Sequence, residues 1–129
     1  MKIEHAALYA GNLEKEKDFF CRYFGAKVPS LYHNPKTGFS SHFLSFEAGA
    51  RLEIMHIDSA ERQESGKKRT GYDHLAFSLK SREEVEELTR RMPEDGYPVL
   101  SGPRVTGDRY FESCIADPEG NRVEITVSP

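Results

Sequence analysis

The sequence has 129 residues, with 18 Lys and Arg against 21 Asp and Glu and a formal net charge of -3. This length is typical of one domain, or of two half-sized modules that share a core. The slightly negative net charge does not favour binding to nucleic acid. The longest apolar run, residues 6–10, is far shorter than the roughly 20 residues that a membrane span needs. The N-terminus has no signal-peptide pattern, so we expect a cytoplasmic protein with neither nucleic-acid nor membrane partners.

The first half of the chain predicts a strand, then a helix, then shorter strands. Asn12 is a suitable N-cap, and Gly25 is placed to end the helix in a left-handed conformation. Turn residues at 35–38 and 47–49 divide the following stretch into extended segments. Between the two caps, apolar side chains recur at roughly helical spacing: Leu13, Phe19, Phe20, Tyr23 and Phe24.

The second half predicts the same order of elements. Ser81 and Glu84 form a capping box, and Pro93 is expected to block continuation of the helix. Turn chemistry at 102–103 and 117–120 is expected to separate the strands that follow. The apolar stripe of this helix consists of Val85, Leu88 and Met92.

Two motifs occur twice, in the same order and at nearly equal spacing. An acid-His-apolar motif begins at Glu4 and again at Asp73, and an Arg-apolar-Glu-Ile motif occupies 51–54 and 122–125. The His and the Glu are 48 positions apart in the first copy and 50 in the second. This repetition predicts a duplicated βαβββ module, with copies at 1–57 and 72–129 and a polar linker at 58–71.

Side chains alternate between the two faces of a strand, so the repeats also predict which residues share a face. Leu75 and Phe77 belong on the face that the helix covers, and His74 on the other. The same alternation separates Glu124 from Val123 and Ile125. Applied to both copies, it places four candidate metal ligands on uncovered faces: His5, Glu53, His74 and Glu124.

Imidazole nitrogen and carboxylate oxygen together suit a divalent ion such as Ni, Co, Zn, Mn or Fe. Four such ligands around a six-coordinate ion would leave two positions for water or substrate, as a Lewis-acid site requires. Arg51 and Arg122 flank the two glutamates and are candidates to orient them, with paired surface arginines as an equally good interpretation. His33, His42 and His56 have no counterpart in the other copy and are interpreted as surface or packing residues, and Cys21 and Cys114 as small buried hydrophobic residues.

The paired His and Arg-x-Glu-Ile halves, with Asp-Pro-Glu-Gly-Asn at 117–121, resemble the vicinal oxygen chelate superfamily. This group includes glyoxalase I, fosfomycin-resistance transferases, bleomycin-binding proteins, methylmalonyl-CoA epimerase and extradiol dioxygenases. The resemblance implies an α+β fold in which two βαβββ modules form a metal-binding half-barrel cleft. It also implies a homodimer, with the site built within one chain or across two.

Within this superfamily the His-Glu-His-Glu set is similar to that of glyoxalase I. The resemblance implies a lyase that isomerises a hemithioacetal, or a related α-hydroxy-carbonyl substrate, through a metal-stabilised enediolate. Glu124 is the first candidate for the proton-transferring carboxylate and Glu53 the second. Tyr9 stands where glyoxalase I usually carries an arginine for glutathione, so the identity of the thiol stays open.

The sequence is also compatible with two functions other than that of a glyoxalase I type of lyase. A three-ligand site of His5, His74 and Glu124 would suit dioxygenase or fosfomycin-type chemistry, and an epimerase is a further variant. A small-molecule-binding protein without catalysis is the third hypothesis, and it predicts that no metal is bound.

Overall fold

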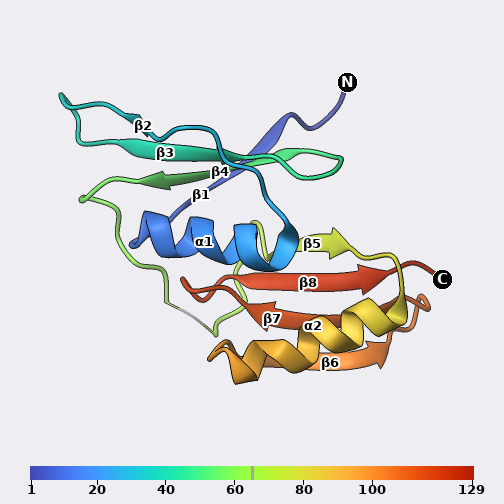
Figure 1. Ribbon diagram of the computed structural model, residues 1–129. Helices are drawn as coiled ribbons and strands as arrows, with labels where there is room; N and C mark the ends of the chain where they lie inside the picture. Colours follow the sequence, from blue (N-terminus) through green and yellow to red (C-terminus); the bar gives the residue numbers. More distant parts are fainter. Residues whose placement is uncertain (65) are drawn as a thin grey trace. The chain divides into compact units, whose positions relative to one another are not determined.

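The computed structural model describes residues 1–64 and 66–129, and the chain divides into two compact units, Met1–Gln63 and Glu64–Pro129. The division falls within the segment 58–71, of which Ser65 lies outside the described residues. The first unit contains β1 (His5–Tyr9), α1 (Leu13–Phe24), β2 (Tyr32–His33), β3 (Ser40–Leu44) and β4 (Arg51–His56). The second contains β5 (His74–Ser78), α2 (Arg82–Glu94), β6 (Val99–Val105), β7 (Phe111–Ala116) and β8 (Arg122–Val127). Both units have the order βαβββ, which confirms the α+β class and the repeated module (Figure 1).

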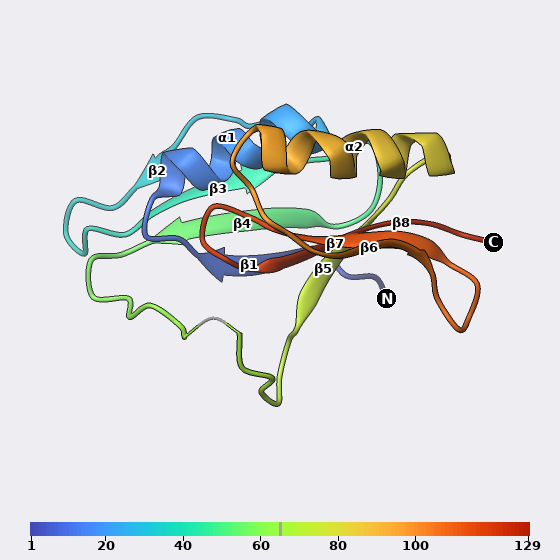
Figure 2. The ribbon, with the colours of Figure 1, turned by 90° about the horizontal axis from the view of Figure 1, so that it is seen from below.

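Each unit folds its four strands into one mixed sheet of the same topology. The order is β1-β4-β3-β2 in the first unit and β5-β8-β7-β6 in the second. The first and last strands of each module pair in parallel, and the remaining neighbours are antiparallel. Figure 2 shows α1 and α2 each lying along one face of its own sheet.

Helix α1 begins and ends at the predicted caps. The Asn12 side chain accepts a hydrogen bond from the Lys15 backbone N–H at 3.0 Å, and Gly25 takes a left-handed conformation with φ 65°. Phe19 and Phe20 are almost fully buried and pack edge to face, with ring centroids 5.3 Å apart. The spacing of the aromatic side chains therefore sets the face of α1 that packs on the sheet.

Helix α2 begins at the predicted cap but differs from the expectation in one capping hydrogen bond and at its C-terminal end. The Ser81 hydroxyl accepts from the Glu84 N–H as predicted, but the Glu84 carboxylate accepts from the Lys80 N–H and not from that of Ser81. Pro93 does not stop the helix, which continues through Glu94. A proline ring clashes with the preceding turn of a helix and so disfavours a longer continuation. Here the helix continues for only one residue after Pro93, and Gly96 then adopts a left-handed conformation with φ 89°.

The prediction of a turn at Gly102 and Pro103 is wrong. Both residues lie inside β6, where the pairing with β7 shifts register on either side of Ser101. Because β6 is the edge strand of its sheet, a proline and a bulge are tolerated there. The turn between β6 and β7 lies after Val105, where the Thr106 N–H donates to the Tyr110 carbonyl at 2.8 Å.

Cross-strand partners and helix contacts identify the two faces of the first sheet. His42 pairs with Ile54 across β3 and β4, and its side chain contacts Glu14 of α1, so both belong to the face that α1 covers. His5 and Glu53 lie on the opposite face by alternation along β1 and β4.

The same argument applies to the second sheet. Ser113 pairs with Ile125, and its hydroxyl accepts a hydrogen bond from Thr89 of α2 at 2.8 Å. This pair belongs to the face that α2 covers, which places Glu124 on the other face. The predicted separation of candidate ligands from core residues is confirmed in both units.

The helices found in the described residues are too short and too polar to cross a membrane.

Candidate metal centre

In the first unit, the strand register brings one histidine and one glutamate together. The parallel pairing of β1 and β4 sets His5 opposite Arg51 and Ala7 opposite Glu53, so the His and the Glu share a face two positions apart. The distance from His5 Nε2 to Glu53 Oε2 is 3.8 Å. The His5 side chain is 40% exposed and that of Glu53 is 14% exposed, so the carboxylate lies deeper.

The second unit repeats this arrangement with a shorter separation. Pairing of β5 with β8 sets His74 opposite Arg122 and Ala76 opposite Glu124. His74 Nε2 lies 3.1 Å from Glu124 Oε2. Both units therefore present one histidine and one glutamate from equivalent strands, β1 and β4 in the first unit and β5 and β8 in the second.

Both pairs fit a divalent ion. Imidazole and carboxylate ligands lie about 2.0–2.2 Å from zinc, so two donors to one ion are at most about 4.3 Å apart. The separations of 3.8 and 3.1 Å fall within that limit. Nitrogen and oxygen donors without a thiolate favour an ion of the Ni, Co, Zn, Mn or Fe group.

Within residues 1–64 and 66–129, no group of three or more His, Cys, Asp or Glu side chains is gathered closely enough to hold an ion. Each unit supplies two donors by itself, and the four-ligand set stays a prediction.

The structure reveals an acidic residue behind each histidine. His5 Nδ1 donates to Glu4 Oε2, and Arg51 donates to Glu4 Oε1, with a distance of 2.8 Å from Nε. These hydrogen bonds hold the pKa of Glu4 below its ordinary value, and the bond from His5 has a larger effect than that from Arg51.

The second unit brings together the equivalent three residues. His74 Nδ1 donates to Asp73 Oδ2 at 2.8 Å, and Arg122 Nε lies 3.3 Å from the same oxygen. The hydrogen bond from His74, followed by the charge of Arg122, lowers the pKa of Asp73. Both arginines thus have a different partner from the one expected, because they hold the acid before the histidine and not the neighbouring glutamate.

The sequence analysis did not single out Glu4 or Asp73 as functional residues. Their signal was present, since the repeated motif begins with an acid in both copies. An exposed acid next to a histidine is ordinary on a protein surface, however, and only the strand register shows that an arginine lies beside it.

Other side chains complete the surroundings of the two pairs. The Phe43 ring packs edge-on against His5 at 5.4 Å, and the Arg51 guanidinium lies 4.4 Å from the centroid of the same ring. In the second sheet, Cys114 is the cross-strand partner of Glu124 and is 1% exposed. Burial raises the pKa of the Cys114 thiol, and partial burial raises that of Cys21, which is only half-buried and not buried as expected.

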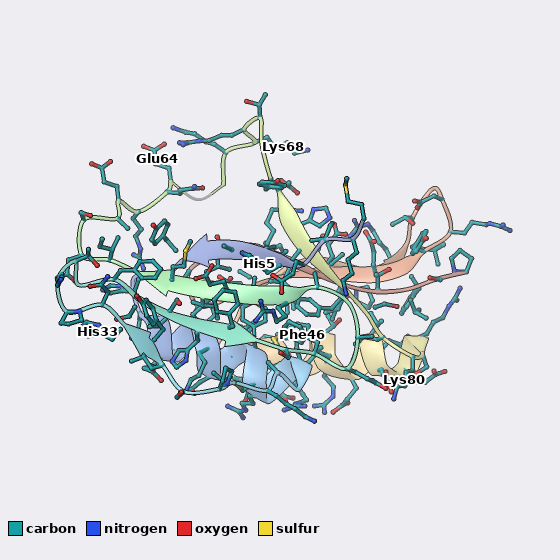
Figure 3. The ribbon with its side chains drawn as sticks, turned by 90° about the horizontal axis from the view of Figure 1, so that it is seen from above. His5, His33, Phe46, Glu64, Lys68 and Lys80 are labelled. Atoms are coloured by element: carbon teal, nitrogen blue, oxygen red, sulfur yellow. The ribbon has the colours of Figure 1, made fainter. Side chains whose placement is uncertain are left out.

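The other three histidines make contacts away from the candidate ligands. His33 lies at the opposite end of the first sheet from His5 and contacts the Ser40 hydroxyl at 2.8 Å (Figure 3). The buried His42 binds Glu14, as described above. His56 donates from Nδ1 to the Ala10 carbonyl at 2.8 Å, and its Nε2 lies 3.2 Å from Asp58.

Comparisons with known proteins show which proteins this chain is similar to. A model of the Glyoxalase/Bleomycin resistance protein/Dioxygenase superfamily matches residues 2–125. The lactoylglutathione lyase of Escherichia coli O157:H7 is 25% identical over 130 residues, which cover 97% of this chain and 91% of that protein. That of Neisseria meningitidis serogroup A is 27% identical over 129 residues, with coverage of 96% and 88%. The solved structure of the trypanothione-dependent glyoxalase I of Leishmania major aligns with a TM-score of 0.77, 21% identity and coverage of 97% and 85%, a likeness of fold.

Proposed function

The chain belongs to the Glyoxalase/Bleomycin resistance protein/Dioxygenase superfamily, and we propose that it is a metal-dependent lyase of the glyoxalase I type. The proposed substrate is the hemithioacetal that a 2-oxoaldehyde forms with a thiol. The observation that carries this proposal is the repeated pair of His Nε2 and Glu carboxylate, once in each unit. Relatives named lactoylglutathione lyase, similar along almost the whole chain, support it.

The proposed ligands of one divalent ion are His5, Glu53, His74 and Glu124. When bound, the ion would supply Lewis-acid stabilisation of the negative charge that develops on neighbouring substrate oxygens. The proposal includes a homodimer in the cytoplasm, with the four ligands drawn from one chain or from two.

The chain's own residues would then move one proton. Glu124 would take the proton from the carbon that carries the hydroxyl group and the sulfur. It would return that proton to the adjacent carbonyl carbon, while the hydroxyl proton passes to the former carbonyl oxygen and a new carbonyl forms next to sulfur. The product is the 2-hydroxy thioester, an isomer of the hemithioacetal, so no oxidant or other co-reactant is needed.

A second candidate rests on the difference between the two pairs. His5 and Glu53 are 3.8 Å apart, whereas His74 and Glu124 are 3.1 Å apart. Both separations allow a shared ion, but the first pair is the less closely constrained one, and the second candidate is a site in which Glu53 is not a ligand and His5, His74 and Glu124 hold the ion. Such a site would suit the oxygen or epoxide chemistry found elsewhere in the superfamily.

The test compares Glu124→Gln and Glu53→Gln with the wild-type protein, using methylglyoxal with glutathione as the probe and thioester formation as the readout. Bound metal is measured by elemental analysis in every sample. For Glu124→Gln we expect kcat/KM to fall by about 100-fold or more, the usual contribution of a general base. Glu61→Gln, at an exposed position after β4, is the matched control and should behave as wild type.

The outcomes separate the candidates. Loss of activity in Glu53→Gln with metal still bound supports the four-ligand lyase, whereas full activity supports the three-ligand site. A wild-type protein that is purified from metal-replete medium without bound metal, and that forms no thioester, would overturn both and leave a binding function.

A further inference from the structure

Each candidate ligand histidine belongs to a group of three residues joined by hydrogen bonds or ion pairs, which we call a triad. The first triad is Glu4, His5 and Arg51, and the second is Asp73, His74 and Arg122. In both, the acid precedes the histidine on the chain, and the arginine is the histidine's register partner on the last strand of the module. The same three kinds of residue therefore meet twice, from separate segments of sequence, although Arg51 hydrogen-bonds to its acid and Arg122 forms an ion pair with its own.

The two nitrogens of each imidazole face different groups. Nδ1 of His74 contacts Asp73 at 2.8 Å, while its Nε2 points to Glu124 at 3.1 Å. His5 has the same orientation, with Nδ1 on Glu4 and Nε2 towards Glu53. An ionised carboxylate only accepts hydrogen bonds, so a neutral imidazole can donate to only one of its two carboxylate neighbours. The contact at Nδ1 is the shorter one, 2.8 Å against 3.1 Å at Nε2 for His74, which favours the proton on Nδ1 and the lone pair on Nε2.

Each arginine lies against the carboxylate of its triad, and in the second triad Arg122 Nε is 3.3 Å from Asp73 Oδ2. Arg51 donates two hydrogen bonds to Oε1 of Glu4, which leaves Oε2 to accept from His5. The Arg51 guanidinium is itself held against the Phe43 ring. Such exposed ion pairs contribute little to folding stability, so their repetition at the two histidines points to a role in positioning.

We propose that Glu4 and Asp73, each held by its arginine, are positioning residues that fix His5 and His74 in the tautomer whose Nε2 binds the metal. This inference rests on the proposed function, because it assumes that the two histidines are ligands. A carboxylate behind a ligating histidine fixes the ring and raises its basicity, and its loss typically costs 10–100-fold in metal affinity.

The test uses Asp73→Ala in the full chain, with two measurements. The first is the tautomer of His74 in the metal-free protein, read from two-bond ¹H–¹⁵N correlations at about pH 8, above the ordinary histidine pKa. Wild type should show the proton on Nδ1, and Asp73→Ala should show a mixture of tautomers or the proton on Nε2. The second is Zn²⁺ affinity by competition with a chelator, which we expect to be about 10–100-fold weaker in Asp73→Ala.

Two further variants serve as controls. Asp73→Glu gives the second triad the acid that the first one uses, and it should restore both the tautomer and the affinity to within about threefold of wild type, well inside the expected loss. Asp58→Ala removes another carboxylate that lies beside a histidine nitrogen, 3.2 Å from His56, and it should leave Zn²⁺ affinity unchanged.

An unchanged His74 tautomer in Asp73→Ala, or a Zn²⁺ affinity within twofold of wild type, would overturn the inference. If wild type binds no metal, the proposed function and the ligand role fail together. The tautomer measurement, which needs no metal, would in that case still show whether Asp73 controls the imidazole.

Discussion

A buried histidine connects the first helix to its sheet through one carboxylate. His42 is 6% exposed, and its Nε2 contacts Oε1 of Glu14 at 2.8 Å, while Lys17 contacts Oε2 of Glu14 at 2.9 Å. The hydrogen bond from His42, followed by that from Lys17, lowers the pKa of Glu14. Glu14 also lies in the first turn of α1, where negative charge is favourable.

This lowered pKa predicts a pH-dependent contribution to stability. A carboxyl group with a lower pKa in the folded than in the unfolded state stabilises the fold above its unfolded pKa, and this stabilisation is lost as the pH falls through the folded pKa. Glu14→Gln should therefore reduce the free energy of unfolding at neutral pH, by less than about 1 kcal/mol because the carboxylate is mostly exposed. The difference from wild type should vanish in acid, at pH values below the lowered pKa of Glu14.

Urea unfolding of wild type and Glu14→Gln across the acid range measures this effect. Glu61→Gln, with an exposed carboxylate, is the control and should follow the wild-type curve. A constant difference between Glu14→Gln and wild type at every pH would show that ionisation of Glu14 is not the cause.

At the scale of elements, both helices could be predicted because their signals are local. Asn12, Ser81 and Gly25 act at the positions that the sequence indicates. The strand faces could be predicted too, because alternation of apolar residues on β4 and β8 is regular. The conformation of Gly102-Pro103 could not be predicted from the sequence, because the same dipeptide is compatible with a turn and with a bulge in an edge strand. Only the pairing of β6 with β7 distinguishes the two.

The position of Gly102 inside β6 leads to a prediction about the chain's tolerance of a side chain there. Gly102 has φ 90°, and an added Cβ would lie 2.6 Å from the Glu112 carbonyl oxygen and 2.8 Å from Ser113 Cα. Both atoms are backbone of β7 and cannot move without disturbing the sheet. Gly102→Ala should therefore add a steric cost, about 1–3 kcal/mol, to the cost of a left-handed backbone.

Gly49→Ala is the matched control for Gly102→Ala. Gly49 has φ 89°, but nothing lies within 4 Å of an added Cβ, so only the backbone cost of about 1–2 kcal/mol applies. Thermal or urea unfolding compares the two variants. Equal losses of stability would contradict the close approach of β6 to β7 at Gly102.

At the scale of the whole molecule, the duplication is what made the candidate site predictable. Neither a single histidine nor a single glutamate is informative alone, but the matched spacing of His5 and Glu53 with His74 and Glu124 identified both pairs. The acids behind the histidines could not be identified as positioning residues in this way. Their role depends on an arginine 47 or 49 positions further along the chain, which reaches the acid only through parallel strand pairing.

The central claim is that the two pairs serve one ion, and it predicts the stoichiometry of metal binding. A Zn²⁺ titration of the metal-free wild-type protein should show one tight site per chain. Because both units would contribute ligands to that site, His5→Ala and His74→Ala should each abolish tight binding. Circular dichroism should remain that of wild type, since both side chains are well exposed, and His33→Ala, on β2, should bind as wild type.

That titration tests the account most directly. One ion per chain, lost in either variant, is the predicted result. Two ions per chain, with each variant losing only one of them, would contradict the claim by showing that each unit binds metal separately. A wild-type protein that binds no Zn²⁺ would contradict the claim altogether.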